Sequence, residues 1–295
     1  MPLQTVDVGA ILYGCPIQTI YMPSKKSPNS QKYPPQVMGI LNVTPDSFSD
    51  GGHFISVDTA FKQARLMATE GAYIIDIGGE STRPGAKAVS LQEELDRVIP
   101  IIEKIRTELP IKISVDTSKS IVMREAIIAG ADMINDVMAL RGDGCLETVA
   151  ATQVDICLMH MQGEPRTMQT KPHYHNVIQD IKNFLLERIE TCLKAGISSE
   201  RLLIDPGFGF GKTMAHNLQL MQQLEELTAL AYPVLIGVSR KSFIGTVLNK
   251  TVTERLYGGL ALAVLAVSKG AKVIRTHDVA ATVEALTMTQ AVLQQ

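Results

Sequence analysis

Residues 72–78 read AYIIDIG, a short run rich in isoleucine that follows one glycine, Gly71, and ends in another. The run is nearly continuously apolar and lacks the strict alternation of a strand with one solvated face. It therefore predicts a strand buried on both faces, as in a parallel sheet.

Similar runs recur along the chain and bring the total to eight. The others are QVMGILNV (36–43), IKISVDT (111–117), ADMINDV (131–137), VDICLMH (154–160), RLLIDPG (201–207), PVLIGVS (233–239) and AKVIRTHD (271–278). Helical patterns separate them, among them NVIQDIKNFLLERIETCLKAG and NLQLMQQLEELTAL, in which apolar residues recur at steps of three and four.

Helix start and stop signals support this alternation. Ser90 with Glu93, and Thr251 with Glu254, have the spacing of capping boxes before helical runs. Glycines follow several helical runs, where they commonly end helices: Gly71, Gly130, Gly196 and Gly270.

Eight strands that alternate with helices predict an α/β protein of the (β/α)₈ TIM-barrel class over residues 36–295, close to the roughly 250 residues typical of that fold. A doubly wound sheet is the alternative, but no G-x-G-x-x-G follows the first run. Residues 1–35 are expected to form a short N-terminal extension with a possible hairpin and a proline-rich loop.

Composition narrows the class of protein. The chain has 295 residues and a formal net charge of −2, and its longest apolar stretch is too short to span a bilayer. Its four cysteines, Cys15, Cys145, Cys157 and Cys192, form no C-x-x-C pair. We expect a cytoplasmic protein with neither nucleic acid nor membrane as a partner.

Polar residues end nearly every apolar run, and in a barrel these positions meet at one rim. They are Asn42, Asp76, Asp116, Asn135, Asp136, His160, Asp205, Ser239, Arg240, Lys241, Arg275 and His277. Any one of them could be a helix cap or a turn former. Together they predict a site at the rim.

The residue types indicate a ligand. Asp116, Asn135 and Asp205 suit a flat heterocycle with several N–H groups and ring nitrogens. Arg83, Arg275 and His277 suit a phosphate. Two loops rich in small and polar residues, at 44–54 and 78–90, are expected to close over the site, although two ordinary loops remain possible.

The stretch IDPGFGFGKT at 204–213 ends like a phosphate-binding P-loop, but Pro206 stands where that pattern needs its first glycine. A glycine-rich turn after a strand is the preferred interpretation. His173 and His175 form an H-x-H pair that we interpret as solvated polar residues rather than metal ligands.

Eight motifs together resemble dihydropteroate synthases, a family of pterin-binding enzymes. They are MGILNVTPDSFSDGG, DIGGESTRPGA, SVDTSK, IND, LMHMQG, DPGFGFGK, SRKSFIG and RTHDV, within residues 36–280. The resemblance implies a barrel that joins a pterin diphosphate to p-aminobenzoate, uses Mg²⁺, and forms a homodimer through its seventh and eighth helices. It also implies competition by sulfonamides.

The resemblance further implies roles for individual residues. The pterin-binding residues would be Asp116, Asn135, Met159, Asp205, Phe210 and Lys241. The diphosphate would contact Asn42, Thr82, Arg83, Arg275 and His277, with Mg²⁺ at Asn42. The p-aminobenzoate pocket would comprise Phe48, Thr82, Pro84, Lys241 and Ser242. Catalysis would rest on Asp50, Arg83, Asp205 and Lys241, and the Gly-Lys-Thr ending would be coincidental.

Two alternatives share features with this prediction. A pterin-binding methyltransferase would have the same barrel, but it would not be expected to carry TPDSFSDGG or STRPGA. A phosphate-binding barrel without catalysis would have no evident need for Asp50, Arg83 and Lys241.

Overall fold

The structure is a computed structural model, and it describes residues 34–44, 57–81, 85–86, 88–164 and 167–294. The predicted extension at 1–35 lies outside the described residues, apart from Pro34 and Pro35. Within the described part, no helix has the length and apolar character needed to cross a membrane.

One parallel sheet contains all eight predicted strands, in the order β6-β5-β4-β3-β2-β1-β8-β7. Their bounds are β1 Gln36–Asn42, β2 Ile74–Gly78, β3 Lys112–Asp116, β4 Met133–Asp136, β5 Asp155–Met159, β6 Leu202–Asp205, β7 Leu235–Ile236 and β8 Val273–Thr276. The two end strands approach each other through an isolated parallel bridge between Ile204 and Val234. The strands therefore curl into a nearly closed barrel, and the (β/α)₈ prediction is confirmed.

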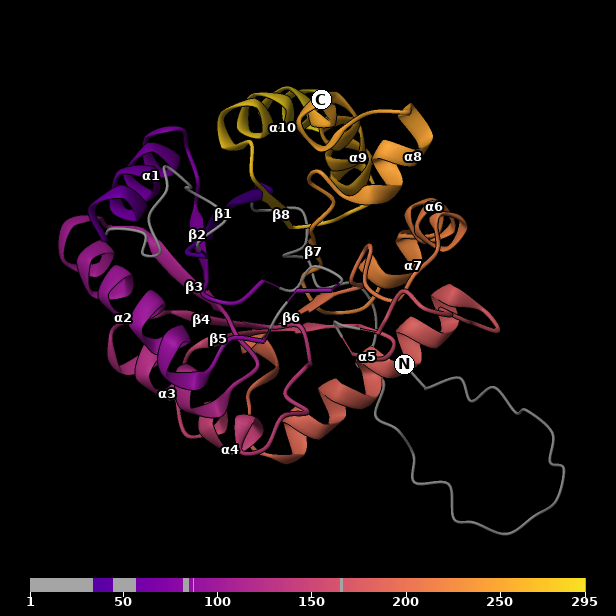
Figure 1. Cartoon of the computed structure of the whole chain (residues 1–295). Helices are drawn as coiled ribbons and strands as arrows, with labels where there is room; N and C mark the ends of the chain where they lie inside the picture. Colours follow the sequence, from indigo (N-terminus) through magenta and orange to yellow (C-terminus); the bar gives the residue numbers. More distant parts are fainter. Residues whose placement is uncertain (1–33, 45–56, 82–84, 87, 165–166, 295) are drawn as a thin grey trace, which may run out of the picture.

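Helices surround the strands as an outer ring (Figure 1). They are α1 Val57–Thr69, α2 Leu91–Glu108, α3 Ser120–Ile128, α4 Cys145–Ala150, α5 Val177–Lys194, α6 Met214–Gln222, α7 Glu225–Thr228, α8 Ser242–Leu248, α9 Leu256–Ser268 and α10 Val279–Leu293. Two 3₁₀ helices, η2 Ser199–Arg201 and η3 Val252–Glu254, precede β6 and α9.

The helix signals in the sequence are largely confirmed. Ser90 and Glu93 form the predicted capping box of α2, and the four predicted glycines all have positive φ after helical runs. The Thr251 box instead caps η3, and α9 begins after Arg255 with no side-chain cap. The pattern NLQLMQQLEELTAL forms two helices because the backbone leaves helical geometry at Gln223.

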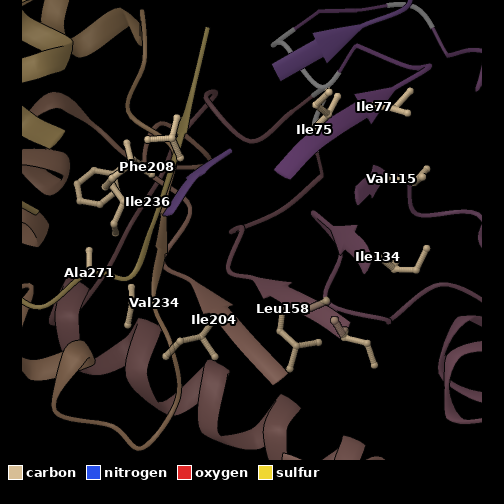
Figure 2. Close-up of a cluster of buried hydrophobic side chains, with 14 of the residues drawn as sticks. Ile75, Ile77, Val115, Ile134, Leu158, Ile204, Phe208, Val234, Ile236 and Ala271 are labelled. Carbon is tan, nitrogen blue, oxygen red and sulfur yellow. The ribbon is translucent and has the colours of Figure 1, made fainter. Parts of the chain in front are cut away.

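The core has two layers that follow from the alternation of side chains along each strand. Inside the barrel lie Met38, Ile74, Leu203, Leu235 and their neighbours from other strands. Between the sheet and the helices lies a larger cluster; Figure 2 labels ten of its residues: Ile75, Ile77, Val115, Ile134, Leu158, Ile204, Phe208, Val234, Ile236 and Ala271.

Candidate active site

The interior apolar layer determines which polar residues face the barrel mouth. Successive side chains of a strand point to opposite faces, so the residue two positions after an inward residue also points inward. Met133 on β4 is an inward residue, and Asn135 follows it by two positions. Leu203 and Asp205 on β6, and Val273 and Arg275 on β8, have the same relation. The strand ends thus present their polar side chains to one shared space.

That space is a recess of about 330 Å³, open to solvent. Its lining includes every residue predicted to contact the pterin: Asp116, Asn135, Met159, Asp205, Phe210 and Lys241. Val137, Gly207, Phe208, Gly237 and Arg275 complete it. Residues from five strands, β3, β4, β5, β6 and β8, and from the loops after β4, β6 and β7 therefore meet at one site.

Arg275 crosses the floor of the recess between two carboxylates. Its Nε donates to Asp76 Oδ2 at 2.6 Å and its Nη2 donates to Asp116 Oδ2 at 2.9 Å. Asn135 Nδ2 donates to the same Asp76 oxygen at 3.1 Å. The two bonds from Arg275 use two of its five N–H donors, so the guanidinium can still offer donors to a ligand.

Asp76 is one of the predicted rim residues, but it had no predicted ligand or catalytic role. It is fully buried, and its Oδ1 has no hydrogen-bond partner among the described residues. Its position two residues after the inward Ile74 was a signal that could have found it. An unpaired buried oxygen beside the recess costs free energy until a donor reaches it.

The recess carboxylates have perturbed pKa values. Burial raises the pKa of Asp116 to about 7, although Arg275 opposes the shift. Burial also raises the pKa of Asp205 to about 6, opposed by the Gly207 N–H that donates to Asp205 Oδ1 at 2.7 Å and by Lys241. Both groups therefore exchange protons near neutral pH, which is typical of ligand-binding and catalytic sites.

Lys241 and Phe210 form a contact pair on one side of the recess. The Lys241 Nζ lies 4.0 Å from the centre of the Phe210 ring, a cation–π distance. Lys241 is also the residue before α8, so its neighbour Ser242 begins that helix and is exposed. Of these two predicted p-aminobenzoate residues, Lys241 lines the recess, and Ser242 follows it in the chain without being part of the lining.

The predicted diphosphate residues are only partly described. His277 follows β8 and lies against Ser239, with its Nδ1 3.1 Å from the Ser239 Oγ. Asn42 ends β1, and an added Cβ on Gly78 would lie 3.6 Å from its Oδ1 and 3.7 Å from the Cβ of Asp116. Gly78 therefore lies between Asn42 and Asp116, and a Cβ there would make ordinary contacts with both. Thr82 and Arg83, like Phe48, Asp50 and Pro84, lie outside the described residues.

The described residues offer few side-chain ligands for a metal ion. Among the described residues, no group of three or more His, Cys, Asp or Glu side chains could hold a metal ion. Mg²⁺ usually keeps several waters and binds one or two protein oxygens together with substrate phosphates. A single amide oxygen such as that of Asn42 suits this mode of binding.

Other strand-end residues have structural partners. The Asp136 carboxylate accepts from the backbone N–H groups of Met138 and Leu140, at 2.8 and 2.7 Å, and so shapes the turn after β4. Arg240 pairs with Asp278. These two side chains have the turn and ion-pair roles that a lone strand-end residue often has.

The glycine-rich stretch after β6 does not present its lysine to a phosphate. Lys212 is buried, and its Nζ donates to the backbone oxygens of Gly207 and Phe210. The stretch is therefore a turn that contacts itself, as the proline at position 206 suggested. His173 and His175 are exposed, which agrees with their interpretation as solvated residues.

Comparisons with known proteins agree with this site. Residues 38–277 match a family described as pterin binding enzyme. A dihydropteroate synthase of Haemophilus influenzae is 56% identical over 257 residues, which cover 87% of this chain and 94% of that protein.

Solved structures give the same result. The Yersinia pestis dihydropteroate synthase, solved with a sulfonamide drug, superposes with a TM-score of 0.86 at 51% identity, covering 89% of this chain and 95% of that one. The Xanthomonas albilineans enzyme in complex with 7,8-dihydropteroate superposes with a TM-score of 0.81 at 48% identity, covering 89% and 95%.

Proposed function

The chain belongs to the pterin-binding enzyme family and, within it, to the dihydropteroate synthases, and on that premise we infer how its residues carry out the reaction. The chain is a transferase of folate biosynthesis. It condenses 6-hydroxymethyl-7,8-dihydropterin diphosphate with p-aminobenzoate and releases 7,8-dihydropteroate and diphosphate.

The observation that supports these roles is the recess itself. Asp116, Asn135 and Asp205 offer acceptors and one amide at the wall, and Phe210 and Met159 offer apolar surface. The N–H-rich edge of a pterin can pair with the polar groups while its ring lies against the apolar ones. Each polar group left unpaired would cost about 1–3 kcal/mol, so the recess would select for such an edge.

The reaction breaks the C–O bond to the diphosphate and forms a C–N bond at the same carbon. The departing diphosphate takes the bonding electrons, and the carbon shares positive charge with the pterin ring. The nearby Asp205 carboxylate stabilises that positive charge, while Lys241 and Arg275 stabilise the negative charge that leaves. The amine of p-aminobenzoate then attacks the carbon and loses a proton to solvent, so no covalent bond to the protein is needed.

Mg²⁺ is part of this proposal, with Asn42 as its protein ligand. When bound, the ion offsets negative charge on the diphosphate. Asn42 would contribute its amide oxygen, and Arg275 and His277 would hold the anion from the β8 side.

The assay that tests the proposed function supplies both substrates, with and without Mg²⁺, and follows dihydropteroate and diphosphate. We expect equal amounts of the two products, only with Mg²⁺, and competition between a sulfonamide and p-aminobenzoate. A folded protein that forms no dihydropteroate would contradict the proposal. Product formation that survives a chelator would contradict the metal role alone.

We propose in addition that the enzyme is a cytoplasmic homodimer. Cys145, Cys157 and Cys192 are free and buried, which is consistent with a reducing compartment. The helices of the seventh and eighth units, α9 and α10, carry one charged residue between them, Glu284. Large apolar residues are exposed on both helices, among them Leu265 and Met288, and a second copy of the chain would cover them.

A further inference from the structure

Lys212 is a buried cation that the proposed reaction does not use. Its side chain lies below the glycine-rich loop at residues 206–213, and the residue is only 3% exposed. Its Nζ lies 2.9 Å from Gly207 O, 3.0 Å from Phe210 O and 3.0 Å from His160 Nδ1. No carboxylate is within salt-bridge distance among the residues that the structure describes.

Burial lowers the pKa of Lys212 to about 7, opposed by the nearby Asp205, so the lysine is charged below that pH. Its three partners match this charged form. An ammonium group has three N–H donors, and the two carbonyl oxygens are acceptors. Burial lowers the pKa of His160 to about 2, and the Lys212 charge adds to the effect, so the imidazole is neutral and its Nδ1 can accept. Each ammonium proton therefore has one acceptor, which offsets part of the cost of burying the charge.

The loop is held by several other side chains as well. Asn217 Oδ1 accepts from Gly209 N at 2.7 Å, Gln169 Nε2 donates to Gly209 O at 2.5 Å, and Tyr174 donates to Gly211 O at 2.8 Å. Of these groups, Lys212 alone carries a charge and joins both ends of the Gly207–Phe210 turn. Its loss would remove the link between that turn and His160 after β5 and leave the loop to the neutral contacts.

The opposite side of this loop forms part of the recess. Phe210 contacts Lys241 through its ring, and an added Cβ on Gly209 would lie 3.1 Å from the Lys241 Cδ. A movement of the loop by a few tenths of an ångström would therefore reach both the apolar surface for the pterin and the Lys241 side chain.

We propose that Lys212 is a positioning residue: its buried ammonium, bound to Gly207 O, Phe210 O and His160 Nδ1, fixes the loop that places Phe210 beneath Lys241 for pterin binding. The proposal rests on the proposed function, because it assigns Lys212 a part in holding that enzyme's pterin substrate.

The charge also links Lys212 to Asp205. Charged and titratable groups face Lys212 from four places: His160 at the end of β5, Asp205 on β6, His216 on α6 and Lys241 before α8. Burial raises the pKa of Asp205, and the charge of Lys212 is one of the influences that lower it. Without that charge the pKa of Asp205 would rise further. As the pH falls, binding that needs the Asp205 carboxylate would then be lost at a higher pH than in the unmodified protein.

The test compares Lys212→Met, which removes charge and hydrogen bonds, with Lys212→Gln, which keeps donors without charge. Arg201→Met is the matched control, because Arg201 is also a buried cation on backbone oxygens, those of Val154 and Val149, before β6 at the opposite end of the barrel. Titration calorimetry with 6-hydroxymethylpterin between pH 5 and 7, at a matched folded fraction, gives the affinity. The probe lacks the diphosphate, and this range lies below the pH at which the pterin ring loses a proton. Steady-state assays give KM and kcat.

We expect Lys212→Met to weaken pterin binding about tenfold, the loss of roughly one charge-assisted hydrogen bond. The acid limb of binding should move to higher pH in both Lys212 variants, and kcat should change less than the KM for the pterin substrate. Arg201→Met should keep the affinity and pH profile of the unmodified protein.

Three outcomes would overturn the proposal. Affinity and pH profile could stay unchanged in folded Lys212 variants, or Arg201→Met could change them equally. Both Lys212 variants could also fail to fold while Arg201→Met folds, which would make Lys212 a structural residue. Product formation by the unmodified protein tests the proposed function separately, so the two failures are distinguishable.

Discussion

Arg275 forms hydrogen bonds with Asp76 and Asp116, which precede it in the sequence by 199 and 159 residues. One side chain with a single positive charge thereby holds two carboxyl groups inside the barrel mouth and faces the recess. Its role in folding and its predicted role in anion binding are therefore linked, and a substitution must affect both.

Arg275→Ala is expected to weaken binding of the pterin diphosphate and also to destabilise the fold. Removing one partner of a buried ion pair costs about 3 kcal/mol. The pKa of Asp116 is about 7, raised by burial and lowered by Arg275, so removing Arg275 raises it further. When folding raises the pKa of a carboxyl, the folded protein loses stability as the pH rises toward that raised pKa. The difference in unfolding free energy between the variant and the unmodified protein should therefore increase above pH 7.

Urea unfolding at pH 6 and pH 8 measures this loss, and Arg240→Ala is the control. Arg240 pairs with Asp278 at a partly exposed site, where an ion pair contributes about 0–1 kcal/mol. Equal losses for the two variants, or a loss that shrinks as pH rises, would contradict the account.

Lys241→Ala is expected to lower kcat by about 100-fold or more, because a charged donor is removed where charge develops. The protein should stay folded, since Lys241 is half-buried at the rim rather than in the core. Steady-state kinetics with circular dichroism as a check of folding measure both. Lys194→Ala, at an exposed site on α5, is the control, and near-normal turnover of Lys241→Ala would refute the role.

At the scale of elements, the loop after β6 depends on glycine at a position of close approach. Gly207 has a φ of 68°, and an added Cβ would lie 1.9 Å from the His160 carbonyl oxygen. A side chain there cannot be accommodated by a rotamer change, because the obstacle is backbone. The loop would have to move away from β5.

A left-handed backbone at a residue other than glycine costs about 1–3 kcal/mol. Gly207→Ala is expected to lower the free energy of unfolding by more than this, because of the added clash. It should also raise the KM for the pterin substrate, since the loop carries Phe210. Gly196→Ala is the matched control: its φ is 86° and an added Cβ meets nothing within 4 Å. Chemical unfolding and kinetics measure the pair, and equal stability losses would argue against the clash.

The strands were predictable because each buries both faces and so lacks the alternation of an exposed strand. Position within a strand then placed Asp116, Asn135 and Asp205 at the rim. The contacts between rim residues were not predictable, since they depend on which side chains meet across the barrel: Arg275 was expected at an anion and lies between two carboxylates. The interruption at Gln223 was also missed, since apolar spacing continues across it to Leu224 and Leu227.

At the scale of the whole molecule, α9 and α10 lie side by side on the outside of the barrel (Figure 1). Leu265, Met288 and Val292 are large apolar residues exposed on these helices, with Val292 68% accessible. Such a face on two adjacent helices is typical of a surface that a partner covers.

We expect the unmodified protein to sediment as a dimer and Met288→Lys to shift it toward monomer, with dimer affinity weakened about tenfold or more. Ile128→Lys is the control, because Ile128 is an equally exposed apolar residue at the end of α3. Sedimentation equilibrium measures the association. A monomeric unmodified protein, or equal effects of both variants, would contradict this interface.

The barrel closes between β6 and β7 through one isolated bridge, while other neighbouring strands share continuous ladders. Asp205 stands on one side of this seam and Lys241 follows the strand on its other side. A substrate bound by both residues would connect β6 and β7, the neighbouring strands joined by the fewest backbone hydrogen bonds. Substrate binding would then stabilise the closed barrel, because a ligand that binds only the closed form shifts the equilibrium toward it.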